Sequence, residues 1–65
     1  MARYDAAIKD LDDALKLDPA IPSALFVRGA AKLKLGDAGG RNDIERAKKL
    51  DKGILDAMTK LGVSP

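Results

Sequence analysis

Residues 22–36 read PSALFVRGAAKLKLG, and this stretch predicts a helix that is apolar around most of its circumference. Pro22 suits the first position of a helix, and Gly36 can adopt the left-handed conformation that ends many helices. Polar strips remain only at Arg28, Lys32 and Lys34. A helix of this kind is usually flanked by neighbours on several sides. We therefore expect residues 22–35 to form the central helix of the fold.

Further helices are predicted on both sides of this segment. Over residues 3–17 apolar side chains recur with the i, i+3, i+4, i+7 spacing of an amphipathic helix, and Pro19 then stops that helix. A third helix is expected over residues 37–51, with Asp37 as its N-cap, and a short fourth one over residues 52–61. No stretch shows the alternation typical of strands. The sequence thus predicts an all-α antiparallel array of about four helices.

Charged residues follow the same helical spacing. Asp5 precedes Lys9 by four positions, and Asp12 precedes Lys16 in the same way. An acidic residue four positions before a basic one stabilises an exposed helix. We therefore expect both pairs to stabilise the first helix.

Length and composition restrict the function. The chain has 65 residues, a net charge of +2, and neither Cys nor His, so it is one small domain without a disulfide or the commonest metal ligand and general base. We expect no enzymatic activity, no cofactor, no bound metal and no small-molecule substrate. No apolar run is long enough to span a bilayer, and no signal peptide is visible, which favours a cytoplasmic protein without membrane contact.

Two ten-residue segments are related by an offset of 33 residues. Residues 10–19 read DLDDALKLDP and residues 43–52 read DIERAKKLDK, with five identities in ten positions. The identical pairs are Asp10 and Asp43, Ala14 and Ala47, Lys16 and Lys49, Leu17 and Leu50, and Asp18 and Asp51. An internal repeat of this length predicts helical pairs that stack side by side.

The period and the residues resemble the tetratricopeptide repeat family. The second helix of a repeat is matched by the spacing of Ala7, Leu11, Ala14 and Pro19. Residues 22–35 resemble the first helix of the next repeat, with Gly29 where two helices approach closely, and Gly40 occupies the small-residue position on the following helix. The family's Trp, Leu and Tyr are replaced here by Leu25, Arg28 and Lys32.

This resemblance implies a single domain over residues 1–65 that starts within a repeat. Residues 3–18 would be the second helix of one repeat, residues 22–52 a full helix-turn-helix repeat, and residues 53–62 a capping helix, as at the C-terminus of a bacterial tetratricopeptide protein. The helix that should precede residues 3–18 is missing. Either the chain is a trimmed part of a longer protein, or it forms a homodimer that covers the open flank. That flank consists of Tyr4, Ile8, Leu11 and Leu15.

The resemblance also implies a protein-interaction or scaffolding function, because the family holds a peptide or a partner helix in a groove lined by the first helix of each repeat. The corresponding positions here are Ser23, Phe26, Ala30, Leu33 and Lys34. They offer a small apolar surface with a cationic edge, which suits a peptide that carries an aliphatic side chain near a carboxylate. The alternative is that Phe26 and Leu33 are core residues.

Two other functions stay open, and one kind of site is disfavoured. The chain could be the structural cap of a longer array with no ligand of its own. It could also be a basic module that contacts nucleic acid through Arg41, Lys48 and Lys52, although no aromatic residue accompanies them to stack on bases. Asp10, Asp12 and Asp13 lack the glycine and the alternating ligands of a calcium loop, so we expect no cation there.

Overall fold

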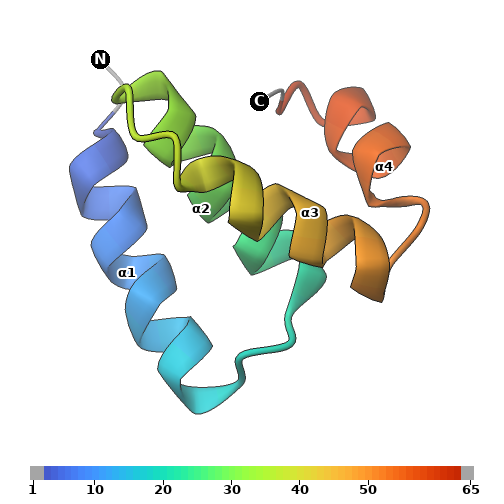
Figure 1. Cartoon of the computed structure of the whole chain (residues 1–65), viewed down its shortest axis with the longest axis horizontal. Helices are drawn as coiled ribbons and strands as arrows, with labels where there is room; N and C mark the ends of the chain where they lie inside the picture. The colour runs from blue at the N-terminus through green and yellow to red at the C-terminus, as the bar shows by residue number, and fades with distance from the viewer. Residues whose placement is uncertain (1–2, 64–65) are drawn as a thin grey trace.

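The computed structural model describes residues 3–63 and contains four helices in that range (Figure 1). They are α1 (Tyr4–Leu17), α2 (Pro22–Lys34), α3 (Gly40–Leu50) and α4 (Ile54–Lys60). No strand occurs among the described residues. The all-α prediction is therefore confirmed. The ends of the predicted domain, residues 1–2 and 64–65, lie outside the described part of the chain.

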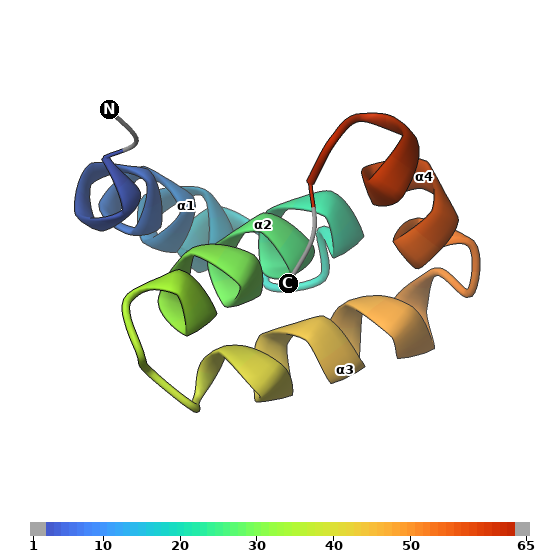
Figure 2. The same cartoon turned by 90° about the horizontal axis from the view of Figure 1, so that it is seen from above.

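Helix α2 is the central element. Figure 2 shows it between α1 and α3, with α4 near the end of α2 that follows the first connection. Residues early in α2 contact residues late in α1 and α3, and its last turn lies beside the start of both neighbours. The neighbours of α2 therefore run antiparallel to it. Because α1 and α3 each pack on α2, this helix has to present apolar side chains on more than one side.

Most helix ends lie at the Pro and Gly residues that were expected to mark them. Pro22 is the first residue of α2, and the backbone of Gly36 has φ of 83° directly after that helix. Gly62 has the same φ after α4. Both glycines therefore end a helix in the left-handed region, which residues with a Cβ atom rarely adopt.

The expected N-cap of α3 is wrong. The Asp37 carboxylate accepts a hydrogen bond from the Gly39 backbone N–H at 2.8 Å, and α3 itself begins at Gly40 with Gly39 as N-cap. Asp37 therefore stabilises the tight turn before the helix rather than the first N–H groups of the helix. The reason is distance along the chain, because Asp37 stands two residues before the position that a capping side chain must occupy.

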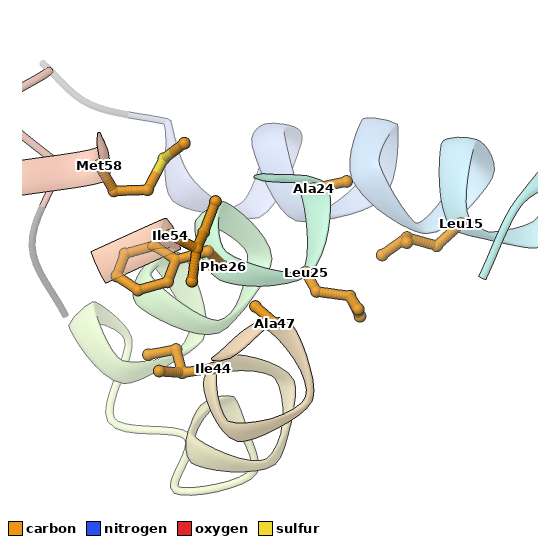
Figure 3. Packing of buried hydrophobic residues seen from close by; sticks show 8 residues of the cluster. All are labelled: Leu15, Ala24, Leu25, Phe26, Ile44, Ala47, Ile54 and Met58. Atoms are coloured by element: carbon orange, nitrogen blue, oxygen red, sulfur yellow. The ribbon is translucent and has the colours of Figure 1, made fainter. Parts of the chain in front are cut away.

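Eight buried apolar side chains form one cluster, which is drawn from all four helices (Figure 3). Phe26 and Leu25 are its largest fully buried members. The remaining members are Leu15, Ala24, Ile44, Ala47, Ile54 and Met58. Leu11, Ile21, Val27, Leu33 and Val63 pack against this cluster and are partly buried. The core thus surrounds the first half of α2.

Helices α2 and α3 approach most closely at Gly29 and Gly40. A Cβ atom placed on Gly29 would lie 2.5 Å from the Gly40 carbonyl oxygen and 2.7 Å from Cγ1 of Ile44. A Cβ atom on Gly40 would collide with the Gly29 carbonyl oxygen. Neither backbone oxygen can move without shifting its helix. The close-approach role predicted for Gly29 is therefore seen in the structure.

The sequence repeat has a counterpart in the backbone. Asp18 and Asp51 both follow the last residue of a helix, with φ, ψ values of −144°, 100° and −144°, 104°. The Asp18 carboxylate accepts a hydrogen bond from the Ala20 N–H at 3.1 Å, and Asp51 accepts one from the Gly53 N–H at 3.0 Å. The connection from α1 to α2 thus starts in the same way as the connection from α3 to α4.

Candidate functional site

A hollow of about 410 Å³ lies between α1, α2 and the residues that follow α4. Its wall is largely apolar and includes Ala7, Val27, Ala30, Ala31 and Val63. Two cationic side chains, Arg3 and Lys34, lie at its border, together with Tyr4 and Gly62. The volume is within the range of about 300 to 1,000 Å³ that is usual for ligand pockets. An aliphatic group next to an anionic group would suit this lining.

A second hollow, of about 530 Å³, lies on the other side of the last turn of α2. Leu33 and Ile44 give it an apolar base, and charged side chains surround that base. These charged residues are Lys34, Arg41, Glu45 and Lys48. Lys48 lies 3.6 Å from the Glu45 carboxylate, so part of the positive charge is already neutralised. Lys34 borders both hollows.

The five residues of the predicted groove do not form one surface. Phe26 is fully buried in the core, and Ala30 is buried, although it lines the first hollow. Leu33 is half-buried and lines the second hollow, and Lys34 is exposed. Ser23 is exposed and lines neither hollow. Phe26 is therefore a core residue, which was the alternative to its place in the groove.

Arg28 joins three helices through its guanidinium group. Its Nε and Nη2 donate to the two carboxylate oxygens of Asp43 on α3, at 2.8 and 2.7 Å. Its Nη1 donates to Asp12 on α1 at 2.8 Å. Lys32 adds a longer contact to Asp43, at 3.7 Å. The side chain of Asp43 is only 8% exposed, which makes this pair part of the interior rather than a surface ion pair.

The charges in this network shift the pKa of both Asp43 and Arg28. Burial alone would raise the pKa of Asp43, but the hydrogen bonds and positive charge of Arg28, with the charges of Lys32 and Arg46, outweigh burial and hold that pKa below its usual value. The hydrogen bond to Asp43 is the main cause that raises the pKa of Arg28. Both groups are therefore charged at neutral pH.

Comparison with known proteins gives no relative from which a role could be transferred. No protein-family model, curated protein or solved structure matches this chain. The tetratricopeptide resemblance therefore stays a prediction based on the repeat and on the glycine at the helix crossing. The hollows and the charged side chains are the features that bear on the function.

Sequence reasoning missed the Arg28 network. The pair expected between Asp12 and Lys16 does not occur among the described residues, because Asp12 faces α2 and binds Arg28 instead. Asp5 likewise contacts Arg3, at 3.8 Å, rather than Lys9. One signal was available, since a long basic side chain in an otherwise apolar helix needs acidic partners on the helices that flank it.

The described residues contain neither a metal site nor a membrane-spanning helix, and the face of α3 carries charges of both signs. Between residues 3 and 63, no group of acidic side chains is arranged to hold a metal ion. No helix in that range is both long and apolar enough to cross a membrane. The basic residues Arg41 and Lys52 are exposed on or just after α3, as is Glu45, so charges of both signs occur on that face.

Proposed function

We propose that this protein is a protein-interaction module that holds an extended acidic peptide in the hollow between α1 and α2. The observation that carries the proposal is the combination of an apolar wall with two cations, Arg3 and Lys34, at the border of one hollow. An aliphatic side chain can bury its surface against the wall while a neighbouring carboxylate pairs with a cation. The hollow is open, which suits a peptide better than an enclosed small molecule.

Binding can be measured with a fluorescein-labelled pentapeptide, Gly-Ser-Glu-Leu-Asp, that ends in a free carboxylate. We expect saturable binding by fluorescence anisotropy, weakened when the leucine is replaced by glycine or the terminus is amidated. Each of these probes removes one half of the proposed recognition, the aliphatic contact or the charge.

Charge reversals locate the binding surface. Arg3 borders only the first hollow and Lys48 only the second, so Arg3→Glu should weaken binding at least tenfold while Lys48→Glu leaves it unchanged. Lys49→Glu is a further control with the same change in net charge, because Lys49 is exposed and lines neither hollow. Equal effects of Arg3→Glu and Lys49→Glu would mean that the peptide senses only net charge, and the proposal would fail.

A further inference from the structure

A third hollow, of about 310 Å³, lies between α1, α2 and α3 beside the connection from α1 to α2. Its floor is apolar, because Leu15 and Leu25 are 6% and 1% exposed, and Pro19 adds to the apolar lining. Its lining comes from residues 12–46, so the packing of three helices within the chain sets its walls. Four charged side chains complete the lining: Asp12, Lys16, Arg28 and Arg46.

Arg28 offers this hollow a fixed set of hydrogen-bond donors. Its side chain is 17% exposed, and Asp43 and Asp12 hold its guanidinium through three hydrogen bonds of 2.7 to 2.8 Å. A guanidinium has five N–H groups. One N–H on each Nη atom therefore has no acceptor among the described residues. These groups can donate to a ligand while the ion pair with Asp43 stays intact.

The hollow carries more positive than negative charge. Three basic side chains and one acidic side chain line it. Among the described residues, neither Lys16 nor Arg46 has a carboxylate within ion-pair distance. Even when Asp43, which pairs with Arg28, is counted, one positive charge remains. An anion with several acceptor oxygens would therefore meet donors from three helices in one place.

We infer that the third hollow binds a small phosphomonoester through its phosphate group. Such a phosphate has three terminal oxygens and a charge of about −1.5 to −2 at neutral pH. Arg28, Arg46 and Lys16 can each donate to one of these oxygens, whereas a carboxylate has only two. The carbon chain beyond the ester oxygen packs against the apolar lining. The volume lies at the lower end of the range of about 300 to 1,000 Å³ for ligand pockets, which favours a small ligand.

This site is independent of the proposed peptide site, because no residue lines both hollows. Arg3→Glu, which should weaken peptide binding, should leave phosphomonoester binding unchanged. Arg46→Gln should have the opposite pattern. Either site can therefore fail without the other.

Binding can be followed by two-dimensional proton–nitrogen NMR of the full chain at constant ionic strength, with propyl phosphate as the probe. We expect the side-chain Nε–H signals of Arg28 and Arg46 to shift saturably. Inorganic phosphate should bind about threefold more weakly, because it lacks the propyl chain that covers the apolar lining. Acetate should bind about tenfold more weakly, because it has fewer oxygens and less charge.

Two matched pairs of variants locate the site. Arg46→Gln should weaken binding of propyl phosphate about tenfold, whereas Arg41→Gln should not, because Arg41 is an exposed arginine of the same helix that lines only the second hollow. Lys16→Gln should act like Arg46→Gln. Its control is Lys9→Gln, at an exposed lysine of α1 that lines none of the three hollows. Equal circular dichroism of the four variants would show that the helices are unchanged.

Asp12 gives a test in which affinity should rise. Its carboxylate accepts a hydrogen bond from Arg28 and lines the same hollow, so its charge repels a bound phosphate. Asp12→Asn removes that charge and keeps an acceptor oxygen for Arg28. The affinity for propyl phosphate should therefore increase about threefold. Asp13→Asn, at an exposed aspartate outside the hollow, should have little effect.

A second titration identifies the source of the phosphate group. N-acetyl-O-phosphoserine methylamide represents a phosphorylated side chain, and propyl phosphate represents a free small ester. Tighter binding of the serine compound would assign the phosphate to a modified side chain. Tighter binding of propyl phosphate would assign it to a free small molecule. Either result supports a phosphate site in the third hollow.

Three results would overturn the inference. No saturable shift of the Arg28 and Arg46 signals up to about 10 mM propyl phosphate, where a millimolar site is nearly saturated, would mean that the network serves packing alone. Equal losses in Arg46→Gln and Arg41→Gln would mean that the anion senses only net charge. Acetate binding as tight as that of propyl phosphate would mean that the hollow does not distinguish phosphate from a carboxylate.

Discussion

Arg28 and Asp43 form a two-pronged ion pair, with Nε to Oδ2 at 2.8 Å and Nη2 to Oδ1 at 2.7 Å, at the crossing of α2 and α3. The neighbouring glycines Gly29 and Gly40 bring the two backbones together at the same level. A polar contact and a steric one thus fix the same crossing.

Removal of the Asp43 carboxylate should destabilise the protein strongly. Asp43→Ala leaves the largely buried Arg28 with Asp12 as its acidic partner among the described residues. Breaking a buried pair in this way costs about 3 kcal/mol. Chemical unfolding followed by circular dichroism measures the loss. Asp13→Ala, which removes an exposed carboxylate, should change the free energy of unfolding by less than about 0.5 kcal/mol. Equal effects would place Asp43 outside the core.

Stability should fall in acid because of the same carboxylate. The folded pKa of Asp43 is lowered, so its contribution is complete above the pKa of an unfolded aspartate, about 3.9, and is lost as the pH falls through the lower folded value. The free energy of unfolding should therefore decline below about pH 4. An Asp43→Asn variant should lose part of this decline. An unchanged pH profile in that variant would mean that other carboxylates cause it.

A methyl group at the helix crossing should be costly. Gly29→Ala would place Cβ against the Gly40 carbonyl oxygen, and overpacking of this kind costs about 2 kcal/mol. Gly29→Leu should prevent α2 and α3 from packing. Gly53→Ala serves as the control, because a Cβ there meets its nearest atom at 3.7 Å and its φ of −90° is open to alanine. Thermal melts of the three variants give the comparison, and full tolerance of Gly29→Leu would contradict the crossing.

Leu15 and Leu17 give a test of the packing face of α1. Leu15 is 6% exposed and Leu17 is 91% exposed, although they are two residues apart. Leu15→Ala should cost about 3 kcal/mol, a large part of the total stability of about 3 to 10 kcal/mol that suits so short a chain. Leu17→Ala should be nearly neutral. Leu11, which is half-buried, should give an intermediate loss. The reverse order of Leu15 and Leu17 would mean that α1 packs through another face.

Much of the architecture was predictable from local signals. Pro22, Gly36 and Gly62 act within one turn of the helix end that they mark, so their effect does not depend on distant residues. The apolar spacing over residues 3–17 likewise predicts the helix α1. These are properties of a short segment, and the four helices follow from them. The flank of Tyr4, Ile8, Leu11 and Leu15 that was expected to be open is, however, partly covered within the chain, because Leu15 is buried and the other three are half-buried.

The candidate site was less predictable, because it depends on which helices meet. Arg28 finds Asp12 and Asp43 at sequence separations of 16 and 15, and only the packed structure shows that both carboxylates face it. The spacing of Phe26 alone allowed two assignments, to the groove or to the core. Phe26 is fully buried because α4 packs over the start of α2. No local sequence pattern predicts that contact.

The matching turns at Asp18 and Asp51 have a consequence for how the length of such a protein can change. Both aspartates direct the chain out of one helix and into the next with the same backbone angles and the same side-chain hydrogen bond. A unit of 33 residues inserted after Asp51 would therefore meet the same exit geometry that α2 meets after Asp18. The exits match but the connections do not have the same length, since residues 18–21 lead from α1 to α2 and residues 51–53 from α3 to α4, so an inserted unit would need one added residue to repeat the first connection.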